Sequence, residues 1–497
     1  MTQTPFPSPG PDEPLAKAQA LCDAGRLREA ADIYRTLAGT HRRQKFVLNR
    51  LGDVLLNLKE FEQAIKSYDR VLAIDPGLAD AHYGRAVALT HLKRPRKALA
   101  SYDSAIAAAP GHANAHCHRA MVLRKMGRLA EALEGYDKAI GLNADHVEAH
   151  LNRGVLLGEC RRAAEGLASF DRAIALRPDH ADARMLKAEL LLLAGEYPEG
   201  WDLYEWRWRS RFRTLVPALA SIPAWDGAQP IAGKTILVHP EVGYGDLLMF
   251  SRYASLIRER GATPVIMAPE PLLELLAGLD GAPRVVRADG PPPPADFRCP
   301  IMSLPRAFAT TLQTVPGRTP YLKADPAKLE SWRSKLGPRQ VPRIGLVWGS
   351  NEKRGIDAIA HRNRSVPLSA LEYLRGLPAE FHSLQKELSA ADAEALGKSH
   401  WLADHSSQLA DFSDTAALAQ EMELVISIDT SVAHLAGALG RPLWVLLPYA
   451  SDYRWTMDAA RTAWYPDAVL FRQSSPAGWD EVVDKVRREL LAFLNVK

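Results

Sequence analysis

The sequence predicts a multidomain protein in which an all-α solenoid of helical repeats precedes two α/β halves. Small and aromatic residues recur with a fixed spacing through the first two fifths of the chain, and after Lys234 short apolar strands alternate with helices. At 497 residues the chain is also too long for one ordinary core. The expected division is a disordered tail 1–10, repeats 11–213, a linker 214–232, a first α/β half 233–325, a connector 326–342 and a second half 343–497.

The composition is that of a soluble globular protein, with 47% hydrophobic and 24% charged residues. A net charge of +4 is small for this length, so a dedicated nucleic-acid binder is not expected. The N-terminus lacks the pattern of a signal peptide, and no apolar run approaches the ~18 residues of a transmembrane segment, which leaves only peripheral membrane contact open. The cysteines form neither a metal-like pair nor a disulfide framework, which favours the cytoplasm.

Six units of 34 residues make up the repeat region. They begin at Pro11, Lys45, Ala79, Ala113, Val147 and Ala181. The eighth position is always small (Ala18, Gly52, Ala86, Ala120, Gly154, Ala188), and the twenty-fourth is always aromatic (Tyr34, Tyr68, Tyr102, Tyr136, Phe170, Tyr204). Small residues let two antiparallel helices approach closely, and the aromatic ring fills the gap that they leave.

This period and pattern resemble the tetratricopeptide repeat (TPR) over roughly 200 residues. The resemblance implies a concave groove that binds a peptide or another extended partner. The small and aromatic residues are interpreted as core packing, without a chemical role.

The sixth unit departs from the pattern in "GWDLYEWRWRSRFR", where Trp201, Tyr204 and Trp208 fall on one helical face. One interpretation is a capping helix that buries this face against the next domain. The other is an aromatic and arginine surface for an acceptor.

Strands and helices alternate in both later halves. In the first half the expected elements are strands 235–238, 263–268 and 283–288 and helices 246–260 and 270–279. In the second they are strands 343–349, 380–385, 424–428 and 442–447 and helices 367–377, 414–422 and 431–439. This alternation predicts two parallel sheets and a cleft lined by the carboxyl ends of their strands.

The stretch "ISIDTSVAHLAGALGRPLWVLLP" carries the main candidate site. Asp429, Thr430 and His434 cluster where a buried strand ends and a helix begins, and the free N–H groups at Thr430–Ser431 make that helix start an anion site. Gly437 is expected to leave room for the ligand. The alternative is that Thr430 is only an N-cap, Asp429 complements the helix dipole and His434 is exposed.

The first half carries a matching turn, "HPEVGYGD". Gly243 and Gly245 permit a tight turn, and Asp246 opens the next helix. The third glycine of a dinucleotide fingerprint is missing. An aspartate at a helix start is usually a cap, but opposite an anion site Asp246 becomes a candidate general base.

Between these two places lies "WGSNEKRGIDAIAHRNRSVPL", which is polar and cationic beyond a strand end. Its Lys353, Arg354, Arg362 and Arg364 could neutralise a diphosphate, and a solvated basic loop is the alternative. No His/Asp cluster has metal-ligand spacing, which disfavours a metal-dependent hydrolase.

The two motifs together resemble those of one enzyme family. "SIDTSVAHLAGALGRPLWVLL" is similar to the nucleotide-binding motif of ADP-heptose:lipopolysaccharide heptosyltransferases, which are family 9 glycosyltransferases of GT-B fold with two Rossmann-like domains. "GYGDLLMFSRY" looks like their first glycine–aspartate loop. The resemblance covers about residues 233–497, and the whole chain looks like bacterial TPR proteins that end in such a domain. Ser431 and Val432 stand where the family often has Gly-Pro.

The resemblance implies an inverting, metal-independent glycosyltransferase that transfers a hexosyl or heptosyl group from a nucleotide-diphosphate sugar, for example an ADP-sugar, without a cofactor. The acceptor would be a protein or glycan recognised in part by the TPR groove. The rival hypothesis is an interaction scaffold whose transferase domain is inactive but still binds a nucleotide. The implied base is Asp246, and the implied donor-binding residues are Asp429, Thr430, Ser431, His434, Arg362, Arg364, Gly243 and Gly245.

Overall fold

The structure is a computed structural model that describes residues 13–495 except 42, 211–215, 242, 282, 351–363, 399, 458–459 and 477. The expected tail, Lys353, Arg354 and Arg362 therefore lie outside the described residues. The chain forms two compact units, one of residues 1–160 and 164–179 and the other of 161–163 and 180–497. The sequence places the end of the repeats at 213, whereas the sixth repeat belongs to the second unit.

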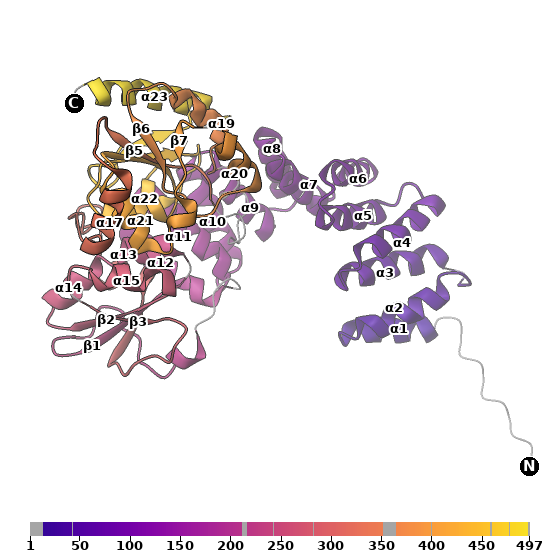
Figure 1. The fold of residues 1–497 in the computed structure, drawn as a ribbon. Helices are drawn as coiled ribbons and strands as arrows, with labels where there is room; N and C mark the ends of the chain where they lie inside the picture. The colour runs from indigo at the N-terminus through magenta and orange to yellow at the C-terminus, as the bar shows by residue number, and fades with distance from the viewer. Residues whose placement is uncertain are drawn as a thin grey trace, which may run out of the picture. The chain divides into compact units, whose positions relative to one another are not determined.

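Six helix pairs make up the repeat region, as the period predicts (Figure 1). The first three pairs are α1 (Glu13–Asp23) with α2 (Leu27–Leu37), α3 (Gln44–Asn57) with α4 (Phe61–Ile74), and α5 (Ala79–His91) with α6 (Pro95–Ala108). The others are α7 (Ala113–Lys125) with α8 (Leu129–Leu142), α9 (Val147–Glu159) with α10 (Ala163–Leu176), and α11 (Ala181–Ala194) with α12 (Tyr197–Tyr204).

The small and aromatic positions are buried in all six repeats, and in two of the pairs a glycine lies directly against the ring. A β-carbon placed on Gly52 would lie 2.6 Å from the ring of Tyr68, and one on Gly154 would lie 2.7 Å from the ring of Phe170. Both distances are shorter than a real contact, so the ring occupies the space that the missing side chain leaves. The core-packing interpretation of these positions is confirmed.

The turn inside each pair requires a left-handed backbone at the fifteenth position of the repeat. Glycine meets this demand in three repeats (Gly25, Gly127, Gly195) and a long basic residue in the other three (Lys59, Lys93, Arg161), with φ between 56° and 62° in the latter. A side chain with a β-carbon is strained in that region, so these repeats carry a local cost that glycine would avoid.

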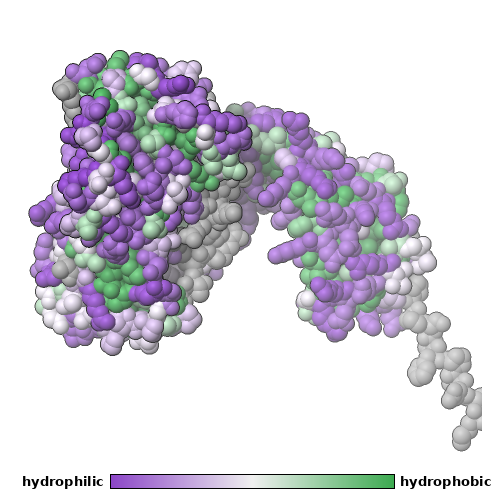
Figure 2. All heavy atoms as spheres, viewed as in Figure 1, coloured by the Kyte–Doolittle hydropathy of each residue, from purple (hydrophilic) through white to green (hydrophobic). Residues whose placement is uncertain are grey.

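Ion pairs on the repeat surface recur with the same period. Arg85, Arg119 and Arg153 each place Nε 2.6–2.7 Å from an aspartate Oδ1 of the preceding repeat (Asp69, Asp103 and Asp137). Hydrophilic residues dominate much of the face of α1–α8 seen in Figure 2, with apolar residues between them. Exposed pairs of this kind add little stability each, so the buried rings carry most of the packing.

The first sheet of the second unit is parallel, in the order β3-β2-β1-β4. Its strands are β1 (Thr235–His239), β2 (Thr263–Ala268), β3 (Arg284–Arg287) and β4 (Phe297–Pro300), and its α-helices are α13 (Tyr244–Phe250), α14 (Tyr253–Glu259), α15 (Leu273–Ala277) and α16 (Leu304–Ala307). The prediction of one helix over 246–260 is wrong. Nε of the buried Arg252 donates to the Met249 carbonyl at 2.8 Å. In a continuous helix this carbonyl would instead accept a hydrogen bond from a backbone N–H one turn later.

The second sheet is also parallel, in the order β10-β9-β8-β5-β6-β7. Its strands are β5 (Arg343–Val347), β6 (Glu380–Ser383), β7 (Leu402–Ala403), β8 (Leu424–Ile428), β9 (Leu443–Leu447) and β10 (Val469–Arg472). The helices of this region are α17 (Pro326–Leu336), α19 (Leu368–Leu371), α20 (Ala390–Lys398), α21 (Phe412–Gln420), α22 (Ser431–Ala438) and α23 (Asp480–Asn495). The strand order is doubly wound, and the two parallel sheets with covering helices confirm the α/β prediction.

The sixth repeat is part of the core of the second unit. Trp201 packs edge-on against Phe250 of α13 and Tyr453, with ring centroids 6.2 and 5.7 Å away. The indole N–H of Trp464 donates to the Tyr197 hydroxyl at 2.9 Å. The capping interpretation is therefore confirmed for this helix pair.

Trp208 does not share that buried face. Helix α12 ends at Tyr204, and residues Glu205–Arg209 continue as the 3₁₀ helix η1. With three residues per turn, the position below Tyr204 is Arg207 rather than Trp208, so Arg207 is buried and Trp208 is half-buried.

We expect Lys93→Gly to stabilise the third repeat. Lys93 is exposed and has φ +56°, so glycine would remove a left-handed strain of about 1–2 kcal/mol, less the entropy that glycine loses on folding. Amide hydrogen exchange of α5 and α6 should become a few-fold slower, roughly the factor of 5 that about 1 kcal/mol provides.

Lys97→Gly is the matched control. Lys97 is equally exposed but lies inside α6, where glycine costs about 1 kcal/mol, and exchange should become faster. If both substitutions accelerate exchange, the strain at Lys93 is not real.

Candidate functional site

The candidate anion site lies at the switch point of the second sheet. Strands β5 and β8 are neighbours there, and the chain winds away from them in opposite directions. In open α/β sheets, ligands bind in the crevice beyond the carboxyl ends of such a strand pair. Asp429 follows β8 directly, and its Oδ2 accepts from Nη1 of Arg364 at 3.0 Å. The structure thus brings together two of the residues that the sequence indicates.

Helix α22 begins at this point without a side-chain cap among the described residues. Thr430 occupies the N-cap position, but its hydroxyl lies 3.2 Å from that of Ser427 and makes no cap hydrogen bond. Thr430 is thus the N-cap residue by position, as one interpretation of the sequence predicts, but without the side-chain hydrogen bond of an ordinary cap. The backbone nitrogens of Ala433 and His434 donate to the Thr430 carbonyl at 3.1 and 3.4 Å. The donor capacity left for another partner is therefore that of the Ser431 and Val432 amides.

His434 is buried rather than exposed, with 3% of its surface accessible. Its ring stacks on Trp455 at 5.3 Å, and Nδ1 lies 3.1 Å from the Tyr465 hydroxyl. Burial lowers the pKa of His434 to about 3, with the cation of Arg454 adding to the shift, so the ring is neutral near pH 7. Its Nε2 lies 4.0 Å from Asp429, too far for a hydrogen bond.

Gly437 does not provide space for a ligand. A β-carbon there would lie 2.4 Å from the ring of Tyr465, so the glycine admits this tyrosine to the face of α22. The sequence interpretation is wrong because the tyrosine, 28 positions further along the chain, gives no local signal of this contact.

Asp246 lies in the first turn of α13 and is largely buried, with 15% of its side chain exposed. Its Oδ2 lies 3.4 Å from the backbone nitrogen of Gly243, so it also acts as a weak cap. Its Oδ1 pairs with Arg454, whose other branch lies 2.6 Å from Asp452. Burial raises the pKa of Asp246 and the Arg454 cation opposes that rise, leaving the pKa above its ordinary value.

The two candidate loops meet at Gly245. A β-carbon on this residue would lie 2.9 Å from Cδ2 of His434 and 3.5 Å from Cα of Ser431. Neither Gly243 nor Gly245 has a positive φ, so the turn that these glycines permit does not use their left-handed freedom. Gly245 is required because the first turn of α13 packs directly on the first turn of α22.

Sequence reasoning missed a third segment, which contacts both the loop of Asp246 and the helix of His434. Arg454 and Trp455 lie in the 3₁₀ turn η7 (Tyr453–Trp455), and they contact Asp246 and His434 respectively. An aspartate–arginine–aromatic cluster after a buried strand, "SDYRW", was the available signal.

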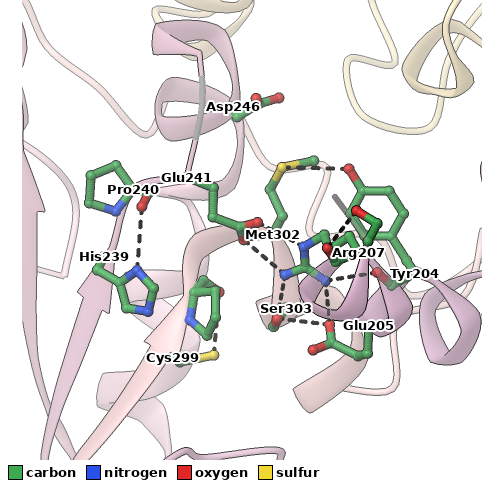
Figure 3. A network of polar contacts seen from close by, with 12 residues as sticks. Tyr204, Glu205, Arg207, His239, Pro240, Glu241, Asp246, Cys299, Met302 and Ser303 are labelled. Carbon is green, nitrogen blue, oxygen red and sulfur yellow. Dashed lines mark hydrogen bonds and ion pairs between the residues drawn. The ribbon is translucent and has the colours of Figure 1, made fainter. Parts of the chain in front are cut away.

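A second missed feature is the buried ion pair of Arg207 with Glu241 (Figure 3). Both side chains have 0% exposure. Arg207 Nε lies 2.7 Å from Glu241 Oε2, and its Nη2 lies 2.9 Å from Oε1 and 2.7 Å from the Ser303 hydroxyl. The third nitrogen, Nη1, donates to the Tyr204 carbonyl at 3.1 Å and to Glu205 at 2.8 Å.

Three further observations bear on what else the described residues could do. A surface depression of about 700 Å³, which Arg375, Lys398 and Trp401 help to line, shares no residue with it. No group of three or more His, Cys, Asp or Glu among the described residues is placed to hold a metal ion. None of the described helices has the length and hydropathy to cross a membrane.

Comparison with known proteins identifies the repeats. A family model described as tetratricopeptide repeat matches residues 15–79, 49–113, 118–159 and 157–205. The N-terminal helix pairs are thus tetratricopeptide repeats. Protein FlbA of Caulobacter vibrioides is 28% identical over 347 residues, which cover 62% of this chain and 54% of that protein. The chain thus spans about half the length of this curated relative.

Solved structures match over roughly a third of the chain. A tetratricopeptide repeat protein from Parabacteroides merdae is 21% identical, with a TM-score of 0.35, and covers 39% of this chain and 77% of its own. MamA of Desulfovibrio magneticus is 21% identical, with a TM-score of 0.32, and covers 35% and 98%. YrrB, a TPR protein with an unusual peptide-binding site, is 20% identical, with a TM-score of 0.31, and covers 36% and 92%.

We expect the second unit to lose stability in acid through His434. Because the ring titrates near 6.5 when unfolded and about 3 when folded, the unfolded chain binds an extra proton below pH 6.5. Stability is then lost as the pH falls from 6.5 towards 3, by up to about 1.4 kcal/mol per pH unit. Urea unfolding at several pH values measures this slope.

His434→Gln should flatten the slope by about one proton. Tyr465→Phe is the control, because it removes the hydrogen bond to the ring but keeps the titrating group. It should lower stability at every pH and leave the slope intact. An unchanged slope in His434→Gln would show that the ring is already charged in the fold.

Proposed function

We propose that residues 233–497 form a GT-B-type glycosyltransferase that moves a sugar from a nucleotide-diphosphate sugar to an acceptor. The observation that supports this best is the meeting of two loops from two parallel sheets. The uncapped start of α22, with Arg364 beside it, packs against the turn that carries Asp246. An anion site next to a buried carboxylate is the arrangement that such a transfer requires.

In this mechanism the donor diphosphate binds at the start of α22. The amides of Ser431 and Val432 and the guanidinium of Arg364 supply hydrogen bonds and positive charge. The acceptor hydroxyl attacks the anomeric carbon from the side opposite the diphosphate, so the configuration inverts. Its proton passes to Asp246 as the new C–O bond forms, and the bond to the phosphate oxygen breaks with its electron pair on the diphosphate.

Arg454 has two roles in this proposal. Its contact with Asp246 keeps the carboxylate ionised in a buried setting, and its charge lies near the place where negative charge develops. His434 acts as neutral packing under the site, because its ring, with a pKa of about 3, is a weaker base than Asp246, whose pKa lies above its ordinary value.

The tetratricopeptide repeats would bind the acceptor. Repeats of this kind present side chains along a stacked surface, which suits a peptide, protein or glycan chain. Binding energy from such remote contacts raises the rate for a large acceptor relative to a small one.

An interaction scaffold with an inactive transferase domain is the second candidate. It is favoured by the Asp246–Arg454 pair, because the arginine makes this buried carboxylate a weaker base than it would be without that partner. The same domain would then bind a nucleotide without turning it over.

We expect Thr430→Glu to abolish binding of an ADP-sugar or another nucleotide-diphosphate sugar. The new carboxylate would lie where the phosphate belongs and would repel it. In the wild type, ligand at 100 times its dissociation constant adds about 2.7 kcal/mol of stability, which thermal unfolding detects.

Ser407→Glu adds the same charge at an exposed position of the same half and should keep the ligand-induced shift. Were Thr430→Glu to keep the shift as well, the anion site would have to lie elsewhere.

We expect Asp246→Asn to lower turnover by roughly 10²–10⁴-fold with donor affinity nearly intact, as for loss of a general base. Asp452→Asn is the matched control, since Asp452 contacts the same arginine without facing the acceptor in this mechanism. Its turnover should fall only slightly. Near wild-type turnover in Asp246→Asn would leave this residue a cap only, because asparagine caps helices equally well.

A further inference from the structure

Arg207 lies at the switch point of the first sheet. Strands β1 and β4 are neighbours there. After β1 the chain continues to β2 and β3 on one side of it, and then returns to form β4 on the other side. Glu241 follows β1 by two residues, and Ser303 follows β4 by three. Arg207 bonds to both, so its guanidinium fills the crevice in which an open α/β sheet would otherwise hold a ligand.

This arginine comes from the end of the last repeat and not from the α/β fold. It belongs to η1, the 3₁₀ turn that continues α12. The same helix packs Trp201 against Phe250, which is the last residue of α13. The repeat therefore contacts the C-terminal end of α13 through Trp201. It also contacts the loop before α13, because Arg207 bonds to Glu241.

Glu241 connects the arginine to the backbone of both strands' loops. Its Oε1 accepts from the backbone nitrogen of Met302 at 3.1 Å, and its other oxygen accepts from Arg207. Five positions later the chain reaches Asp246, in the first turn of α13. A displacement of Glu241 would also displace Asp246, because the two residues are only five positions apart in the chain.

We propose that Arg207 is a positioning residue for the loop that carries Asp246, which makes the sixth tetratricopeptide repeat an integral part of the transferase site. The guanidinium donates to both carboxylate oxygens of Glu241 and so fixes the direction of the chain as it enters α13. The inference rests on the proposed transferase function for its effect on turnover. Its structural part is testable without any turnover.

The test uses Arg207→Lys in the full chain. Lysine keeps the positive charge but cannot make two parallel bonds to one carboxylate. We expect amide exchange of α13 (Tyr244–Phe250) to become about 5- to 30-fold faster, with β2 (Thr263–Ala268) unchanged. Turnover of the nucleotide-sugar should fall about 10²-fold with its KM nearly unchanged, because the base is displaced while the donor site is intact.

Arg306→Lys is the matched control. Arg306 pairs with Asp202 of α12 at 2.8 Å, so it joins the same repeat to the same half, but at the surface. We expect no change in α13 exchange or in turnover.

The double variant Arg207→Met with Glu241→Met separates positioning from mere stability. Replacing a buried pair by apolar side chains often keeps the fold, so the melting temperature should stay close to that of Arg207→Lys or above it. We expect turnover to remain low and α13 exchange to remain fast, since Met302 has also lost its acceptor. Recovered turnover would overturn the proposal, as would unchanged α13 exchange in Arg207→Lys. If the wild type shows no transfer at all, the proposed function fails, and the exchange data alone decide the role of Arg207.

Discussion

The pair between Arg207 and Glu241 joins the last helical repeat to the first sheet of the second unit through two buried side chains. Two full charges with 0% exposure are costly to take out of water, so such a pair persists only when every polar atom finds a partner. All three nitrogens of this guanidinium are engaged, by Glu241, Ser303, Glu205 and the Tyr204 carbonyl. Removing one partner of such a pair costs about 3–5 kcal/mol, because the other charge stays buried. The repeat and the first sheet are consequently joined by a pair in which the loss of either side chain would leave a buried charge without its partner.

That junction explains why the sixth repeat differs from the other five. A repeat at the end of a solenoid has no following repeat to cover its apolar face. Here the rings of Tyr197 and Trp201 are covered by Trp464, Phe250 and Tyr453 instead. The second helix of this repeat is also short, and its continuation as a 3₁₀ turn directs an arginine inward. The helix pair of the sixth repeat, which packs into the core of the second unit, therefore also supports helix α13.

The sequence predicted those elements whose residues recur at a regular spacing. The period of the repeats and the alternation of buried strands gave six helix pairs and both sheets. The strands β4, β7 and β10 were missed because segments of two to four residues carry too little pattern. At the site, Asp429 and Arg364 meet as expected, since both follow neighbouring strands. The contacts of Asp246 with Arg454 and of Gly437 with Tyr465 join positions far apart in the chain, and no local pattern records them.

The charges around Asp246 define what the site can do. Arg454 contacts both Asp246 and Asp452, while Arg364 contacts Asp429, so each cation already has a carboxylate partner. In the proposed transfer, a diphosphate bound at α22 would bring additional negative charge into this partly buried cluster, where charges interact more strongly than in water. The cations would then be shared between carboxylates and phosphate, and a carboxylate with less of its cation binds a proton more readily. Donor binding would in this way raise the basicity of Asp246 at the moment when an acceptor hydroxyl has to lose its proton. The buried, neutral His434 beside them suits this arrangement, because a third cation would compete for the same carboxylates.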